Sequence, residues 1–95
     1  MPRKNDIRIL VVDDEPDVLE LVVFHLEKEQ YKVVVANTGD KALKMARENL
    51  PSLLVLDLML PGINGLEICQ LLKRDPKTRD IPILMLTARA AEENR

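Results

Sequence analysis

Short apolar runs alternate with longer amphipathic stretches along most of the chain. The runs are rich in β-branched and aliphatic residues, which is typical of buried strands. The expected strands cover residues 7–12, 31–36, 53–56 and 81–87. The stretches between them carry apolar residues at helical spacing. The expected helices run from Pro16 to about Glu29, from Thr38-Gly39-Asp40 to just before Pro51, from the end of a 58–65 loop to about Arg74, and from Ala88 onward.

Local signals support these boundaries. Pro16 suits the first turn of a helix, and the acidic residues around it suit the positive end of the helix dipole. Asp75-Pro76 is expected to end the third helix. The first helix has a wider apolar surface than one sheet contact needs, so it is expected to pack against two partners. Its apolar residues are Val18, Leu19, Leu21, Val22, Val23, Phe24 and Leu26.

The regular exchange of strand and helix predicts an α/β fold. Strands that alternate with helices form βαβ units, which give a parallel sheet with right-handed crossovers and helices on both faces. The run at 53–56 is apolar throughout, as expected for a strand that is buried on both faces. No repeat or linker divides the chain, and 95 residues form one modest core, so residues 1–95 are interpreted as a single domain.

Composition narrows the function. The formal net charge is −2 and no long basic block is present, which argues against nucleic-acid binding by this chain. No apolar run has the length of a membrane span, and no signal peptide is evident. The single cysteine, Cys69, cannot form an internal disulfide. These observations predict a cytoplasmic protein without a membrane partner.

Three carboxylates occupy the ends of predicted strands. Asp13 and Asp14 follow the first strand, and Asp57 follows the third. Ligands of open parallel sheets bind beyond the carboxyl ends of the strands, so these side chains converge if the two strands are neighbours. Like charges about 4 Å apart repel by roughly 4 kcal/mol at an effective dielectric of 20. An oxygen-only cluster of this kind favours Mg²⁺ as a ligand.

A simpler interpretation exists for part of this set. Acidic residues before Pro16 are ordinary at a helix N-terminus, so Asp13 and Asp14 could serve only as caps. Asp57 has no such duty, because it lies between two apolar stretches, and it favours a functional cluster. His25 and Cys69 are interpreted as ordinary helix residues, since no second ligand or activating charge is near them in sequence.

The chain resembles the receiver domain of two-component response regulators. Three motifs carry the resemblance, and they occur in the same order as in the family. Within the family, the sequence is most similar to the winged-helix transcription-factor regulators. The motifs are Ile9-Leu10-Val11-Val12-Asp13-Asp14-Glu15-Pro16, Leu54-Val55-Leu56-Asp57-Leu58-Met59-Leu60-Pro61-Gly62-Ile63-Asn64-Gly65 and Ile81-Pro82-Ile83-Leu84-Met85-Leu86-Thr87-Ala88.

The resemblance implies a role for each matching residue. Asp57 matches the phosphoacceptor, which takes a phosphoryl group from a sensor histidine kinase or a small phosphodonor. Asp14 matches a direct Mg²⁺ ligand, Asp13 one that acts mainly through water, and Met59 one that offers its backbone carbonyl. Thr87 matches the hydroxyl residue that turns toward the phosphoryl oxygens. The implied protein is a signalling receiver rather than a turnover enzyme.

The resemblance also implies a flavodoxin-like open sheet with strand order 2-1-3-4. The family's fifth strand, with its phosphoryl-binding lysine, and its fifth helix would follow residue 95, so the domain is expected to be incomplete at its C-terminus. Lys73 and Lys77 cannot replace that lysine, since they are expected at the far end of the sheet. An alternative therefore stays open: a receiver fragment that is not phosphorylated and acts as an interaction or dimerisation module.

Two further expectations follow. If the fourth strand is an edge, its apolar sequence predicts a homo-oligomer formed through that open edge. A Mg²⁺ phosphohydrolase with an aspartyl nucleophile is disfavoured, because such enzymes need two acids in D-x-D spacing and Asp13 and Asp14 are adjacent.

Overall fold

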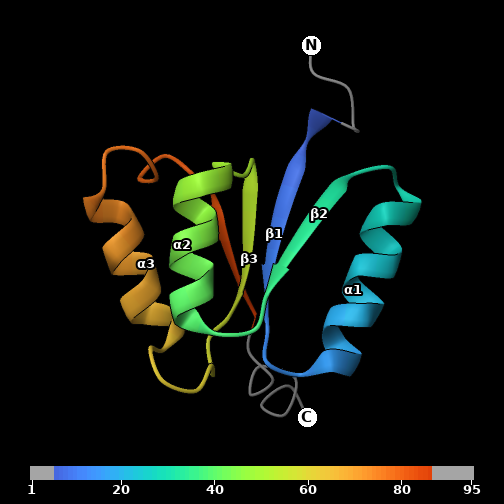
Figure 1. The fold of residues 1–95 in the computed structure, drawn as a ribbon, viewed down its shortest axis with the longest axis horizontal. Coiled ribbons are helices and arrows are strands. Elements are labelled where there is room, and N and C mark those ends of the chain that lie inside the picture. The colour runs from blue at the N-terminus through green and yellow to red at the C-terminus, as the bar shows by residue number, and fades with distance from the viewer. Residues whose placement is uncertain (1–5, 87–95) are drawn as a thin grey trace, which may run out of the picture.

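The computed structural model describes residues 6–86 of the chain. Within that range the chain forms a sheet and three helices that alternate as the hydrophobic pattern predicts (Figure 1). The strands are β1 (Arg8–Val12), β2 (Lys32–Ala36), β3 (Leu53–Asp57) and β4 (Ile83–Leu86). The helices are α1 (Pro16–Lys28), α2 (Gly39–Asn49) and α3 (Gly65–Arg74).

The strands form one parallel sheet in the order β2-β1-β3-β4. The predicted α/β fold and strand order are therefore confirmed. β1 pairs with both β2 and β3, so the first strand of the sequence lies in the interior of the sheet. β3 pairs in turn with β4, which is an edge strand among the described residues. All four strands are parallel, so their carboxyl ends lie together at one end of the sheet.

Helices cover both faces of the sheet, as Figure 1 shows: α2 and α3 lie on one face and α1 on the other. Side chains alternate along each strand, so Leu10 and Val12 face α2 and α3 while Ile9 and Val11 face α1. The larger core lies under α2 and α3. Its buried members are Leu10, Val12, Ala36, Ala42, Leu43, Ala46, Leu54, Leu56, Leu60, Ile68, Leu72 and Ile81.

Helix α1 packs less completely than the others. Leu19, Val22 and Leu26 contact the sheet, but no residue of α1 is fully buried. Leu21 and Phe24 are 60% and 59% exposed, so a second apolar side of the helix has no cover within residues 6–86. None of the helices in this range has both the length and the apolar character needed to cross a membrane.

Several element boundaries differ by one or two residues from those expected, and two of them have a clear local reason. Helix α1 stops at Lys28 because Gln30 adopts a left-handed conformation with φ 73°, and the Tyr31 N–H donates to the Leu26 carbonyl at 3.2 Å. β4 begins at Ile83 rather than at Ile81. The Ile81 N–H is taken by the Thr78 carbonyl at 3.0 Å, which holds Ile81 in the preceding turn.

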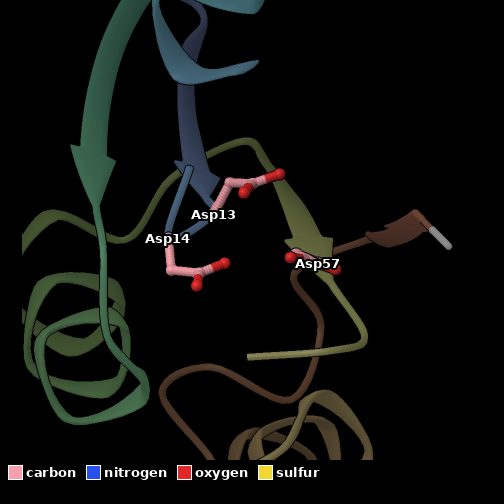
Figure 2. Close-up of side chains that lie close together, drawn as sticks. All are labelled: Asp13, Asp14 and Asp57. Carbon is pink, nitrogen blue, oxygen red and sulfur yellow. The ribbon is translucent and has the colours of Figure 1, made fainter. Parts of the chain in front are cut away.

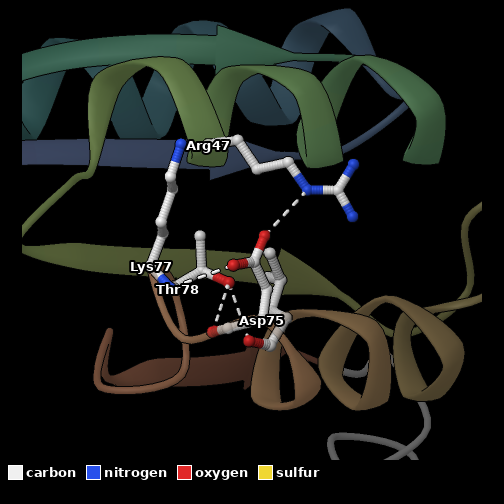
Figure 3. Close-up of polar contacts among 5 residues, drawn as sticks. Arg47, Asp75, Lys77 and Thr78 are labelled. Carbon is white, nitrogen blue, oxygen red and sulfur yellow. Dashed lines mark hydrogen bonds and ion pairs between the residues drawn. The ribbon is translucent and has the colours of Figure 1, made fainter.

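A polar network stabilises the end of the sheet where the strands begin, opposite their carboxyl ends (Figure 3). The buried Thr78 hydroxyl donates to the Leu72 carbonyl at 2.7 Å, at the end of α3. Asp75 accepts from the Lys77 N–H at 2.9 Å and pairs with Arg47 of α2 at 3.3 Å. This network joins the C-terminal ends of α2 and α3 to the turn that leads into β4.

Candidate functional site

Asp13 and Asp14 directly follow the last residue of β1. The Asp13 N–H donates to the Ala36 carbonyl at 3.1 Å, which extends the pairing with β2 by one residue and fixes the Asp13 backbone. One Asp13 carboxylate oxygen, Oδ1, accepts from the Glu15 N–H at 2.9 Å. The Asp13 side chain is only 6% exposed, whereas Asp14 is exposed. The chain then turns into α1 at Pro16.

Asp57 is the last residue of β3 and is paired in register with Leu86 of β4. Its side chain is partly exposed, and its Oδ1 accepts from the Met59 N–H at 3.0 Å. The next residue, Leu58, continues the strand pairing, because its N–H donates to the Leu86 carbonyl at 3.0 Å. The start of the loop that follows Asp57 thus holds its carboxylate at the carboxyl end of the sheet.

The fold brings these three acids together. Each of Asp13, Asp14 and Asp57 offers a carboxylate oxygen, and these oxygens all lie within 4.8 Å of one another. Figure 2 shows Asp13 and Asp14 at the end of β1, with Asp57 beside them at the end of β3. The pairing of β1 with β3 is the direct cause, since it places the carboxyl ends of the two strands next to each other.

The cluster carries an electrostatic cost. Burial raises the pKa of Asp13 above its ordinary value, because a charged carboxylate is poorly solvated there. The neighbouring charges of Asp57 and Asp14 raise this pKa further, while the hydrogen bond from the Glu15 N–H lowers it. The Asp13 carboxyl therefore loses its proton at a higher pH than an isolated aspartic acid does.

A pocket of about 440 Å³ opens over the cluster. Lysine and arginine are missing from its lining within residues 6–86. The lining residues are Asp13, Asp14, Glu15, Val18, Asp57, Met59 and Leu86. Lys73 lies at the other end of the sheet, as predicted, where its Nζ donates to the Arg79 carbonyl at 3.0 Å. The pocket therefore has acidic walls with apolar side chains beside them.

A larger hollow of about 590 Å³ lies at the beginning of β1 and β2. Its lining mixes charges of both signs, with Arg8 and Lys32 near Glu27, and the Arg8 guanidinium is already occupied by the Asn49 carbonyl at 3.1 Å. In residues 6–86, the only group of three or more acidic, histidine or cysteine side chains that could hold a metal is the one at Asp13, Asp14 and Asp57. Chemistry rather than size therefore selects the acidic pocket.

The other candidates from the sequence fall into two groups. Met59 is exposed on the pocket wall, next to Asp57. Thr87 lies outside the described residues. His25 is exposed on α1 with its ring against Phe24, and Cys69 is partly exposed on α3. Neither residue belongs to the acidic cluster.

Sequence reasoning missed three residues of the pocket wall: Glu15, Val18 and Leu86. Glu15 could have been found, because it directly follows the two aspartates. Val18 could have been suggested by its place on the first turn of the helix that begins beside them. Leu86 could be placed only once its register opposite Asp57 was known.

The donor set fits a small hard cation. All three side chains offer oxygen, two of the three are accessible, and their mutual repulsion falls when a positive ion is shared among them. Burial first, and the charges of Asp57 and Asp14 after it, raise the pKa of Asp13, and a bound cation would offset both. Asp13, Asp14 and Asp57 are thus the residues that could hold a divalent ion.

Comparison with known proteins points to one family. The model of the response regulator receiver domain matches residues 9–95. The phosphate regulon transcriptional regulatory protein PhoB of Klebsiella pneumoniae is 50% identical over 88 residues, which are 93% of this chain and 38% of that protein. The transcriptional regulatory protein ResD of Bacillus subtilis is 41% identical over 95 residues, which are 100% of this chain and 38% of that protein.

Solved structures agree with this. The N-terminal domain of a response regulator receiver protein from Methanoculleus marisnigri has a TM-score of 0.80 at 38% identity, over 90% of this chain and 74% of that one. The non-phosphorylated HemR receiver domain from Leptospira biflexa has a TM-score of 0.79 at 38% identity, over 93% and 70%. The chain spans about two fifths of the length of the curated relatives, and most of the length of these solved domains.

Proposed function

The chain belongs to the family of response regulator receiver domains, and we propose that it accepts a phosphoryl group on Asp57 with the help of Mg²⁺. The observation that carries this proposal is the gathering of three carboxylate oxygens within 4.8 Å at the carboxyl edge of the sheet. A phosphoryl group adds further negative charge, so an acidic pocket receives one only together with a cation.

The chain's own residues have separable tasks in this proposal. A carboxylate oxygen of Asp57 attacks phosphorus, and the bond from phosphorus to the donor breaks. The leaving group is the imidazole of a phosphohistidine or the acetate of acetyl phosphate. The Met59 N–H orients the Asp57 carboxylate through its 3.0 Å hydrogen bond. Asp14 and Asp13 hold the cation, with Asp14 the more accessible of the two and the Met59 carbonyl as a further ligand. Bound Mg²⁺ supplies positive charge that neutralises the incoming phosphoryl oxygens.

Partner and output are part of the same proposal. Receiver domains take their phosphoryl group from histidine kinases, and we assign a sensor histidine kinase as the donor for this chain. The names of PhoB and ResD describe transcriptional regulators, which supports an output through transcription by a winged-helix segment. Thr87 is the proposed hydroxyl that contacts the phosphoryl oxygens. A cytoplasmic location fits such a pathway.

The proposal is tested by Mg²⁺ titration and phosphorylation in parallel. Amide NMR shifts on Mg²⁺ addition are expected to concentrate at residues 13, 14 and 57–59, and acetyl phosphate with Mg²⁺ is expected to add one phosphoryl mass that maps to Asp57. Asp57→Asn removes one charge and the nucleophile, so it should abolish labelling and weaken the shifts. Asp80→Asn is the matched control, because Asp80 is an exposed acid before β4 and the net charge changes equally.

The outcomes separate the alternatives. Labelling at another residue, or Mg²⁺ shifts that Asp57→Asn leaves unchanged, would contradict the proposed site. Mg²⁺ binding without any labelling by acetyl phosphate or by a phosphorylated kinase would favour the second candidate function, a receiver that acts as an interaction module without phosphorylation.

One observation supports that second candidate, in the form of a homo-oligomer. Among residues 6–86, β4 is an edge strand that alternates between partly buried and exposed side chains, and its Leu84 and Leu86 are 53% and 36% exposed. An exposed apolar edge can pair with the same edge of a second copy. Light scattering over a dilution series measures this directly: a concentration-dependent dimer that Leu84→Lys dissociates is expected, and a monomer at all concentrations would contradict it.

A further inference from the structure

Two helices that pack on the same face begin with a buried glycine. Gly39 is the first residue of α2 and Gly65 the first residue of α3. Both lie against the same segment, the 58–64 loop that connects β3 to α3 and starts beside Asp57. The contacts are close enough to leave no room for a side chain.

Gly65 contacts the beginning of the 58–64 loop. Its N–H donates to the Leu58 carbonyl at 3.2 Å. A Cβ atom at this position would lie 2.8 Å from the Leu58 Cα and 3.1 Å from the Asp57 carbonyl oxygen. These are backbone atoms, so no rotation of a flexible side chain can relieve the overlap. Any larger residue at position 65 must therefore displace either α3 or the backbone beside Asp57.

Gly39 contacts the far end of the same loop. A Cβ atom here would lie 2.9 Å from the Ile63 Cβ and 3.0 Å from the Ile63 carbonyl oxygen. It would also approach the Ile68 Cδ1 at 3.2 Å, which a change of the Ile68 side chain could relieve in part. The 58–64 loop is thus held at both ends by close approach of a helix start.

Displacement of this loop would reach the acidic cluster through the hydrogen bond of Met59 and would also disturb the pairing with β4. The Leu58 N–H donates to the Leu86 carbonyl, and the Met59 N–H donates to Asp57 Oδ1. Leu60 is buried in the main core and resists outward movement of the loop. A shift at Leu58 therefore changes the position of the Met59 N–H and, with it, the orientation of the Asp57 carboxylate.

We propose that Gly39 and Gly65 are positioning residues, which hold the 58–64 loop against Asp57 and so set the geometry with which the cluster binds Mg²⁺. The metal-binding part of this inference rests on the proposed function. The hold on Asp57 and Met59 does not, because it concerns the metal-free protein. Groups that orient a metal ligand from outside typically change metal affinity by 10- to 100-fold when altered.

The same loop supplies a matched control. Gly62 adopts a left-handed conformation with φ 79°, but a Cβ at this position would meet nothing within 4 Å. Asparagine tolerates that conformation. Gly62→Asn therefore removes a glycine from the 58–64 loop without placing a Cβ against another atom, whereas Gly65→Ala and Gly39→Ala each create such an overlap.

The experiment compares amide spectra and Mg²⁺ affinity across these variants. Gly65→Ala is expected to move the Met59 and Asp57 amide signals of the metal-free protein and to raise the Mg²⁺ dissociation constant by about tenfold or more. Gly39→Ala should act in the same direction by a smaller factor, because part of its overlap is with a side chain. Gly62→Asn should leave both measurements close to those of the parent chain.

A stability control excludes general loosening of the fold. Thr78→Val removes a buried hydrogen bond at the opposite end of α3 and should lower stability without moving the Met59 amide or the Mg²⁺ affinity. If Gly65→Ala does not fold, Gly39→Ala carries the test. Normal Met59 signals and Mg²⁺ affinity in a folded glycine variant would overturn the inference. A parent chain that binds no Mg²⁺ would refute the proposed function, while the Met59 signals would still decide the positioning role.

Discussion

The two ends of the sheet, where the strands begin and where they end, differ in how their charged groups are neutralised. At the edge where the strands begin, polar side chains have partners: Arg47 pairs with Asp75, and the Thr78 hydroxyl is bound to the Leu72 carbonyl. At the edge where the strands end, Asp13, Asp14 and Asp57 crowd together, with no lysine or arginine in the described wall of their pocket. One edge is built for stability, while the other retains unfavourable charge.

This difference indicates which end of the sheet binds a ligand and which end only stabilises the fold. Satisfied polar networks stabilise a fold, whereas unneutralised acids persist where a ligand relieves them. The strands are short, so both edges belong to one small domain and can be altered independently. Changes at the beginning of the strands should affect stability alone, and removal of an acidic charge at their ends should affect stability and metal binding in opposite directions.

The largest effect on stability is expected for Thr78→Val. Thr78 is fully buried, and loss of its hydroxyl would leave the Leu72 carbonyl with only the longer hydrogen bond, 3.3 Å, from the Asp75 N–H. We expect a loss of about 2 kcal/mol in the free energy of unfolding, measured by urea denaturation. Lys77→Gln, at the exposed neighbouring position, should have almost no effect. Equal stability of Thr78→Val and the parent chain would show that this edge is not what holds the helix ends.

A smaller effect of opposite sign is expected for Asp13→Asn. The asparagine oxygen can still accept the Glu15 N–H, while the charge that raises the energy of the cluster is gone. We expect the metal-free protein to gain about 1 kcal/mol at neutral pH and to bind Mg²⁺ more weakly. Thermal melts with and without Mg²⁺ measure both effects. A less stable metal-free variant would refute the idea that Asp13 is under charge strain.

The pH dependence of that gain is fixed by the sign of the shift. The pKa of Asp13 is raised in the folded state above its ordinary value of 3.8, so the folded protein binds this proton more tightly than the unfolded chain does. The contribution of Asp13 to stability is therefore fully present below that ordinary value and is lost as the pH rises through the raised pKa. The advantage of Asp13→Asn should appear across the same window.

The smallest effect is expected for Arg47→Gln. Its ion pair with Asp75 is 3.3 Å long, but the side chains are 47% and 23% exposed, so solvent screens most of the attraction. We expect a loss below about 0.5 kcal/mol at low salt and none at high salt. Urea denaturation at two ionic strengths measures it. A loss as large as that of Thr78→Val would mean that the ion pair, and not the buried hydroxyl, dominates this edge.

Much of the fold was predictable because its signals are local. The apolar runs gave every described strand to within two residues, and Thr38 caps α2 through its hydroxyl, which accepts the Lys41 N–H. Periodicity alone did not establish that β1 and β3 are neighbours; the family resemblance supplied that order, and the pairing of the two strands confirms it. The gathering of Asp13, Asp14 and Asp57 follows from the order.

What escaped prediction depends on contacts between distant segments. Thr78 gives no sequence sign of its burial, since it lies in a polar turn. The loop expected over 58–65 includes Gly65, which instead begins α3 and lies against Leu58. Leu50, at the end of α2, adopts a left-handed conformation with φ 45° that glycine or asparagine would adopt more easily. The roles of Asp57, Met59 and the two other aspartates stay predictions.

The interior position of β1 has a consequence for how the chain folds. β1 is made first but needs partners that come much later: Arg8 is in register with Lys32, and Ile9 with Leu53. None of the four described strands can pair with the next one through a simple hairpin, because each connection between them contains a helix. Such non-local pairing slows folding relative to a helical bundle of equal length. The acids meet only when β1 and β3 have joined, so their repulsion opposes that pairing.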